Sequence, residues 1–229
     1  MLALVALVAG LLLGGALSLR AQPAALGPAL HALGRTVRLA ALATALALAP
    51  GLSLGLWLAR VADDSIRSRA VRSARGAATA LPAVVFGLAG WVLVGVSTGL
   101  RGTTLAMALV LAAINLPWLS SLAEGALRAV PAELEEASLA LGGSQVATIF
   151  RVTLPLAARG ILAAVVLCLG RSFAECAPLL CVAPVPAEAP LTVTLWLAPA
   201  DSAEAAVGAA LLAALALATS AAGRRLRSP

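Results

Sequence analysis

The sequence predicts an all-α protein that crosses a membrane several times, and three observations lead to that fold class. The chain has 229 residues, of which 62% are hydrophobic and only 11% are charged, whereas soluble domains are roughly half apolar and about a quarter charged. The apolar residues fall in long runs of about 20, the length that a helix needs to cross a bilayer. The 16 basic residues are all arginine, and most lie between the apolar runs, where orientation signals belong.

Six apolar segments are candidate membrane-spanning helices, and we expect them to form a single transmembrane domain over residues 1–229. They cover residues 2–19, 39–59, 77–100, 102–123, 160–183 and 205–223. The first segment could instead be a cleaved signal peptide, but no basic region precedes it, which favours a retained span. Proline and glycine inside the other segments are compatible with spanning helices, because neighbouring helices satisfy the freed backbone groups.

The placement of arginine predicts that both ends of the chain face the cytoplasm. With the N-terminus inside, eleven arginines fall in inner segments and four in outer segments, as the positive-inside rule requires. The inner set is Arg60, Arg67, Arg69, Arg72, Arg75, Arg128, Arg151, Arg159, Arg224, Arg225 and Arg227, and the outer set is Arg20, Arg35, Arg38 and Arg101. We expect the inner connection 60–76 to be a solvated loop that anchors this orientation, with contact to partner subunits as the alternative.

Composition argues against several other functions. Without lysine the chain has no Walker A loop, so ATP and magnesium would have to be bound by another chain. Cys168, Cys176 and Cys181 form no CxxC pair, and His31 is the single histidine, so we expect no metal site. No nucleophile–base pair indicates a catalytic site, and arginines between apolar runs do not indicate nucleic-acid binding. We therefore expect a protein that is not an enzyme and holds no cofactor.

The polar segment 124–159, between the fourth and fifth runs, is expected to lie in the cytoplasm as two short helices. Pro131 suits a first helical turn, and the acids that follow it suit the positive end of the helix dipole. Gly142-Gly143 would end this helix, and Ser144 would cap a second helix that stops just before Pro155. Physical arguments leave two roles open: a lone surface hairpin, or a structure that docks into a groove on a soluble partner.

This hairpin resembles the EAA loop of ABC-importer permeases. The family pattern is EAA, three residues, Gly, nine residues and then I-x-L-P, which Glu136-Ala137-Ser138, Gly142 and Val152-Thr153-Leu154-Pro155 follow with Ser138 and Val152 as mild departures. The resemblance implies that the loop docks on an ATP-binding subunit. The residues that it implies for coupling to the ATPase are Glu136, Ala137, Gly142, Leu154 and Pro155.

Arg171 and Glu175 are the charged residues of the fifth run. Four residues apart, they would share one face of a continuous helix, with Arg171 about 16 Å beyond Gly160 and near the bilayer midplane. A charge at that depth costs at least about 2.5 kcal/mol, so both side chains should face the bundle interior or an aqueous path. They form either a structural ion pair or a site where Arg171 helps an anion to pass and Glu175 orients it.

Asn115 is a polar residue inside the fourth run. A buried amide in a span usually bonds another helix. A role in lining the substrate pathway is the alternative, and Asn115 is therefore a candidate pathway residue beside the charged pair.

The sequence around the charged pair resembles a narrower family, the A-type permeases of phosphate importers. Residues 171–180 follow that family's RAxGETAPLL, with Ala174 for glycine and Cys176 for threonine, and segments 81–88 and 127–142 also follow its patterns. The resemblance covers about residues 40–225 and implies phosphate transport by alternating access. Permeases for molybdate, tungstate and sulfate are similar and are the first alternative. An ATP-independent channel or secondary carrier is the second.

The resemblance also implies partners. A dimer of ATP-binding subunits would dock on the cytoplasmic loops, and a homologous second permease would complete the pathway, because six helices supply half of it. An extracytoplasmic binding protein would deliver the substrate. The expected location is the cytoplasmic (inner) membrane, with the chain crossing the lipid bilayer several times.

Overall fold

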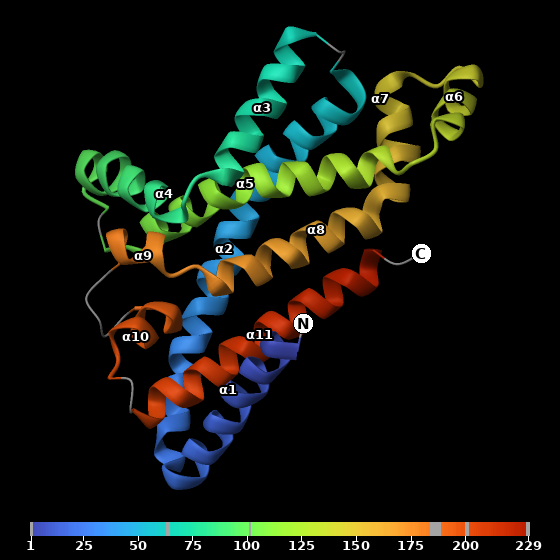
Figure 1. Ribbon diagram of the computed structural model, residues 1–229. Helices are drawn as coiled ribbons and strands as arrows, with labels where there is room; N and C mark the ends of the chain where they lie inside the picture. The colour runs from blue at the N-terminus through green and yellow to red at the C-terminus, as the bar shows by residue number, and fades with distance from the viewer. Residues whose placement is uncertain (1, 63–64, 101, 184–188, 200–201, 228–229) are drawn as a thin grey trace.

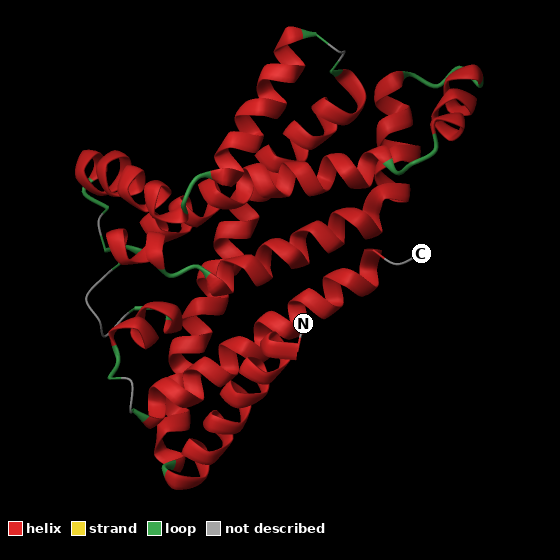
Figure 2. Cartoon of the chain, viewed as in Figure 1, coloured by secondary structure: helices red, strands yellow, loops and turns green. Residues whose placement is uncertain are grey.

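The computed structural model describes residues 2–62, 65–100, 102–183, 189–199 and 202–227, without the side chains of residues 2–8, 196 and 227. Arg101 and the side chain of Arg227, two of the arginines used for the predicted orientation, lie outside the described residues. Within the described part the chain is helical and contains no β-strand, as Figure 2 shows. This confirms the predicted all-α class.

The chain forms helices of very different length. In order they are α1 (Leu2–Ala21), η1 (Pro23–Ala25), α2 (Leu26–Leu56), η2 (Trp57–Val61), α3 (Ile66–Ala80), α4 (Ala83–Gly90), η3 (Trp91–Val96), α5 (Thr104–Arg128), α6 (Ala132–Ala140), α7 (Gln145–Thr148), η4 (Ile149–Thr153), α8 (Leu154–Ala174), α9 (Ala177–Val182), α10 (Leu191–Leu197) and α11 (Ala203–Arg227). The first of the η elements is a 3-10 turn, and the other three are π-helical turns.

Four continuous helical stretches of the described chain are long and apolar enough to cross a membrane. They are Pro23–Val61, Thr104–Arg128, Gln145–Ala174 and Ala203–Leu226. Residues 66–96 would be a fifth, although α3 and the helix that follows it are bent by 95°. The first predicted run, 2–19, lies within α1, a helix of 20 residues. The count of about six spans stays a prediction.

Two predicted segments have other boundaries in the structure. α2 begins at Leu26, well before the predicted start at residue 39, so Arg35 and Arg38 lie in a helix and not in an outer loop. The predicted span 160–183 is broken at Glu175, where the backbone is extended. Pro178 explains this break, because it has no N–H to donate to the carbonyl of Ala174, the last residue of α8.

The prediction of a loop at residues 60–76 is wrong, and the predicted span 77–100 is not one straight helix. Most of the predicted loop belongs to α3, which Ser65 caps by accepting a hydrogen bond from the N–H of Ser68 at 3.4 Å. The chain then turns at Leu81-Pro82 into α4, since proline cannot continue the hydrogen bonding of α3. Two arginines of α3, Arg72 and Arg75, pair with Glu124 on α5.

α2 makes its most extensive contact with α5, and a row of small residues makes this close approach possible. Ala43, Ala47, Gly51 and Gly55 recur every four residues along one face of α2, and all four are buried. A carbon atom added at Gly55 would lie 2.9 Å from the carbonyl oxygen of Ser120 on α5. Small residues of this kind let spanning helices pack where lipid supplies no hydrophobic drive between them.

The other long helices extend this core sideways. α8 packs on α5, α11 packs on α8, and α1 packs on α11, so the four run side by side while α2 crosses them (Figure 1). α1 and α11 run in opposite directions, and both chain ends lie on the side of this layer where α8 begins (Figure 1). The α6–α7 hairpin lies at that same end.

Short helices close the opposite end of the layer (Figure 1). α4 packs on α9, with Gly87 against the backbone of Pro178. The start of α10 and the residues just before it are held to α2 by two hydrogen bonds. One runs from the Leu191 N–H to Thr36 Oγ1 at 2.8 Å, and the other from Arg35 Nε to the carbonyl oxygen of Ala189 at 3.0 Å. The two ends of the molecule therefore differ. The α6–α7 hairpin lies at one end, and the short helices α4, α9 and α10 lie at the other.

Substitution of Gly55 tests the close packing of α2 on α5. Gly55→Leu is expected to lower stability by about 1–3 kcal/mol, because extra side-chain volume would force the two backbones apart. Gly34→Leu is the matched control, since a carbon added at Gly34 of the same helix meets no atom within 4 Å. Thermal unfolding of the detergent-solubilised protein measures both variants. Equal unfolding midpoints for Gly55→Leu and the native chain would contradict the importance of this contact.

Candidate functional site

The predicted pair of short helices joins α5 to α8. α6 ends at Ala140, and the chain turns through Gly142 at φ +84°, the left-handed region that glycine favours. The N–H groups of Gly142 and Gly143 donate to the carbonyl oxygens of Leu139 at 2.9 Å and Ser138 at 3.0 Å. These bonds satisfy carbonyls that the end of a helix leaves free, so the predicted glycine turn is confirmed.

The second helix of the hairpin begins as predicted but continues further. Ser144 Oγ accepts a hydrogen bond from the Ala147 N–H at 3.2 Å and caps α7. The expected end before Pro155 is wrong, because the chain passes from α7 through η4 into α8 without a break. Pro155 fits at the start of α8 because the wider π-helical turn before it interrupts the regular hydrogen-bond ladder.

The hairpin presents an exposed, partly apolar surface. No residue of α6 is buried. Leu139, Leu141, Val146 and Phe150 are all exposed, and Leu141 keeps 90% of its surface. Apolar side chains gathered on the exposed surface of a polar segment mark a site of protein interaction.

The residues expected to couple this hairpin to a partner lie in two different environments. Glu136 and Ala137 are exposed on α6, and Gly142 is exposed in the turn. Leu154 is partly buried against the cluster that contains Leu127, Val130 and Ala157, and Pro155 is exposed beside it. The first three thus face outward, while Leu154 joins the hairpin to the helical body.

Glu135, which the sequence suggested only as an acid for the helix dipole, makes the polar contacts between α6 and the body. Its Oε1 lies 2.8 Å from Nε of Arg60 and accepts a hydrogen bond from Thr153 Oγ1 at 2.7 Å. Arg60 in turn donates through Nη2 to the carbonyl oxygens of Leu127 at 2.7 Å and Val130 at 3.3 Å. No local pattern indicates this cluster, because its members come from separate parts of the chain.

A second carboxylate, Glu124 near the end of α5, attaches α3. Glu124 is buried and receives contacts from Arg75 at 2.6 Å, Arg128 at 3.0 Å and Arg72 at 3.2 Å. Arg72 and Arg128 also donate to the carbonyl oxygen of Leu58, at 2.9 Å and 3.0 Å. A buried charge has to be paired, and the pairing of Glu124 with Arg72 and Arg75 holds α3 against α5.

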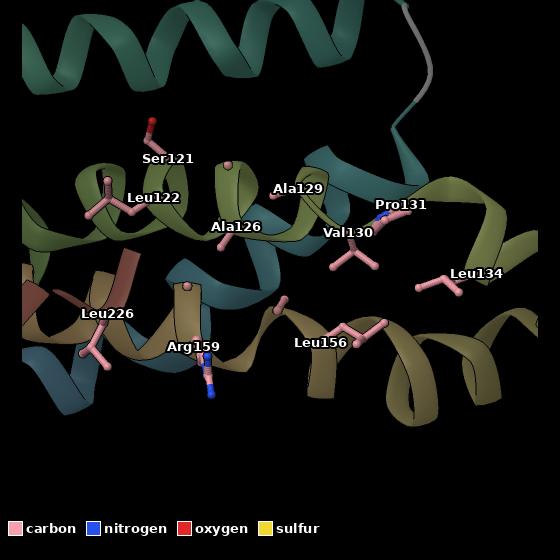
Figure 3. Close-up of a pocket in the computed structure, with 13 residues that line it drawn as sticks. Ser121, Leu122, Ala126, Ala129, Val130, Pro131, Leu134, Leu156, Arg159 and Leu226 are labelled. Atoms are coloured by element: carbon pink, nitrogen blue, oxygen red, sulfur yellow. The ribbon is translucent and has the colours of Figure 1, made fainter. Parts of the chain in front are cut away.

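A groove of about 600 Å³ lies beside the root of the hairpin, between the end of α5 and the start of α8 (Figure 3). Leu122, Val130 and Leu156 line it together with Leu134 of α6 and Leu226 of α11. Arg159 is the charged residue among the described residues that line it. The face of α6 that carries Leu134 therefore borders open space.

At the other end of α8, Arg171 and Glu175 form the predicted ion pair, with Arg171 Nη2 3.3 Å from Glu175 Oε1. Glu175 is not on the helix as expected, since it follows the last residue of α8 in extended conformation. The guanidinium of Arg171 stands 5.3 Å from the centre of the Trp118 ring, within range of a cation–π contact. Its Nε is buried and has no hydrogen-bond partner among the described residues.

Asn115 lies next to this region but faces the contact between α5 and α8. Its Nδ2 donates to Ser172 Oγ at 2.8 Å, and Ser172 donates to the carbonyl oxygen of Cys168 at 3.0 Å. Asn115 is 1% exposed. The expected bond to another helix is confirmed, while the role in a pathway stays a prediction.

The described part of the chain shows no group of three or more His, Cys, Asp or Glu that could hold a metal ion. Cys168 is a free, buried thiol on α8, and Cys176 and Cys181 are free and partly buried. The chemistry that the site offers is therefore that of charge and hydrogen bonding around Arg171 and at the root of the hairpin.

Comparison with known families gives one extensive match. The family described as "Binding-protein-dependent transport system inner membrane component" matches residues 51–226. Among solved structures, the inward-facing MetNI methionine ABC transporter is similar in fold, with a TM-score of 0.75 and 20% identity over 89% of this chain and 96% of that chain.

Two curated relatives are also similar in sequence. The phosphate transport system permease protein PstA of Xylella fastidiosa is 35% identical over 57% of this chain and 45% of its own length. A probable molybdenum ABC transporter permease of Haloferax volcanii is 34% identical over 80% of this chain and 71% of its own length. The chain spans about half the length of the phosphate permease relatives it matches, between 45% and 50% of the longer matches.

Proposed function

This chain belongs to the binding-protein-dependent transport system inner membrane components, and we propose that it is the permease subunit of an ATP-driven importer that carries phosphate. The observation that carries the proposal is the exposed hairpin, whose partly apolar surface lies at one end of the bundle while its root is bonded to the spanning helices. A partner that binds this surface can move the helices that enclose a pathway.

The hairpin is the docking site of an ATP-binding subunit in this proposal. Glu136, Ala137 and Gly142 face the partner, and Leu154 with Pro155 connects the hairpin to α8. The exposed leucines of α6 and its turn suit a groove lined by apolar side chains. ATP and magnesium belong to that partner, because this chain lacks the lysine of a phosphate-binding loop.

The assembly would contain further subunits. A second, homologous permease faces this chain across the pathway, a dimer of ATP-binding subunits holds the two hairpins, and an extracytoplasmic binding protein delivers cargo. ATP-driven closure of the dimer then switches the helices between outward-facing and inward-facing states. Because the hairpin lies at the same end of the layer as both chain ends (Figure 1), its docking on a cytoplasmic ATPase places both ends in the cytoplasm.

The surroundings of Arg171 support an anionic cargo. Its guanidinium lies beside Glu175 and Trp118, and its side chain keeps 32% of its surface, so an anion can reach it. A guanidinium fork matches the geometry of tetrahedral oxyanions. The similarity to a phosphate permease favours phosphate. The similarity to a molybdenum permease favours molybdate or a related oxyanion as the second candidate.

Competition between oxyanions tests the cargo. Uptake of labelled phosphate by cells that produce the complete transporter is expected to fall when unlabelled phosphate is added in excess, and to persist when molybdate, tungstate or sulfate is added. Absence of transporter-dependent uptake of labelled phosphate, together with uptake of labelled molybdate, would assign the transporter to the second cargo.

Glu136→Gln and Gly142→Val test the docking of the ATPase. Both variants are expected to reduce uptake and to weaken co-purification of the ATP-binding subunit. The first removes an exposed charge of the docking surface, and the second places a branched side chain at φ +84°, which costs about 1–2 kcal/mol. Glu133→Gln, another exposed acid of α6, serves as the control. Normal co-purification and uptake in both variants would favour a carrier that works without ATP.

Arg171→Gln tests the anion site. We expect the complex to assemble but uptake to fall at least about tenfold, the equivalent of about 1.4 kcal/mol. Arg171→Gln/Glu175→Gln separates the two roles of the pair, since it removes both charges and leaves neither unpaired. If the double variant recovers full uptake, the pair is structural and Arg171 does not contact the cargo.

A further inference from the structure

α6 is attached to the rest of the molecule by few contacts. None of its residues is buried, and it packs mainly against α7 and η4 of its own hairpin. On one side it borders the groove between α5 and α8, to which it contributes Leu134 (Figure 3). Because α7 continues through η4 into α8, a push on α6 can reach α8 along the chain, but only a specific contact can carry it to α2 as well.

Glu135 provides such a contact. Through one carboxylate oxygen it meets Nε of Arg60 at 2.8 Å and accepts the hydrogen bond of Thr153 at 2.7 Å. Arg60 belongs to η2, the π-helical end of α2, and Thr153 belongs to η4, the π-helical turn that leads into α8. Glu135 thus joins α6 to two turns of a rare kind that is frequent at functional sites.

The partner of Glu135 is itself held in place. Arg60 Nη2 donates to the carbonyl oxygens of Leu127 at 2.7 Å and Val130 at 3.3 Å, at the end of α5. Thr153 is fully buried. The side chains of Arg60 and Glu135 keep only 16% and 19% of their surface, so solvent screens this pair less than it would an exposed one. Arg60 is therefore fixed by its two bonds to the end of α5, while its Nε, which makes no hydrogen bond among the described residues, meets Glu135 as an ion pair.

We propose that Glu135 is the positioning residue through which movement of the hairpin reaches α2 and α8, an inference that rests on the proposed function. Neighbouring residues of a helix point about 100° apart, and the two adjacent acids of α6 accordingly face different ways. Glu136 is exposed and available to a docked subunit, whereas Glu135 holds the helical body. Docking and transmission of movement are thus divided between them.

The test uses the complete transporter, reconstituted in liposomes with inorganic phosphate, or with molybdate if competition identifies that cargo. Glu135→Gln removes the charge but keeps an oxygen that can accept from Thr153. We expect the complex to assemble and to hydrolyse ATP as the native one does. The number of anions transported per ATP is expected to fall at least about fivefold, the lower range of coupling between sites. A merely structural contact would reduce assembly or both rates together.

Two further variants define the outcome. In Arg60→Gln the number of anions transported per ATP should also fall. In Arg60→Gln/Glu135→Gln this number should be no lower than in the single variant that lowers it more, because the two side chains act as one unit. Glu133→Gln is the matched control and should keep the native ratio. An equal loss in Glu133→Gln, or additive losses in the double variant, would overturn the proposal.

Assembly failure in Glu135→Gln would be resolved by Thr153→Val, which removes the hydroxyl donor and preserves side-chain shape. A reduced ratio of transport to ATP hydrolysis is again expected, and a native ratio would overturn the proposal. If the native complex transports with ATP and Glu135→Gln does so equally well, the inference fails while the proposed function stands. If the native complex shows no ATP-driven uptake, the proposed function itself fails.

Discussion

The close packing of α2 on α5 is the constraint on which the other contacts depend. Ala43, Ala47, Gly51 and Gly55 have little or no side chain, so the backbones of α2 and α5 approach each other closely. Only at that separation can Arg60, at the end of α2, reach the carbonyl oxygens at the end of α5. The same closeness places the Leu58 carbonyl where arginines of α3 and α5 donate to it. A larger residue at one of these four positions would push α2 away from α5 and so disrupt the contacts of Arg60 and of the Leu58 carbonyl.

The charged residues are distributed unevenly between the two ends of the bundle. At the hairpin end, Glu124 and Glu135 each organise arginines from different helices, and these pairs bind α3 and α6 to the core. At the opposite end, Arg171 has a single described carboxylate partner and keeps an unpaired donor. The first arrangement ties helices from separate parts of the chain together through several ion pairs. The second is a single ion pair, and the anion site proposed for it depends on the part of the Arg171 side chain that stays exposed.

Local signals account for what could be predicted. The Gly142-Gly143 turn and the Ser144 cap depend on residues within a few positions of one another, and both are present in the structure. The prediction of one continuous span over 160–183 was wrong, because the apolar run continues past Glu175 whereas Pro178 ends the hydrogen bonding of α8. The prediction of a solvated loop over 60–76 was also wrong. Nothing near these arginines in the sequence indicates a partner, because Glu124 lies about 50 residues further along the chain.

The sequence by itself determined the all-α membrane class and the hairpin between the fourth and fifth runs, and it predicted the pairing of Arg171 with Glu175, although it placed Glu175 on a helix that in fact ends at Ala174. Hydrophobic runs, turn residues and side chains four positions apart act over short stretches of chain, so their consequences can be read without a fold. Only the tertiary structure decided that α3 is a docked helix and that Glu135, not Glu136, meets Arg60. Those contacts join helices far apart in sequence, and their geometry depends on how closely α2 and α5 pack.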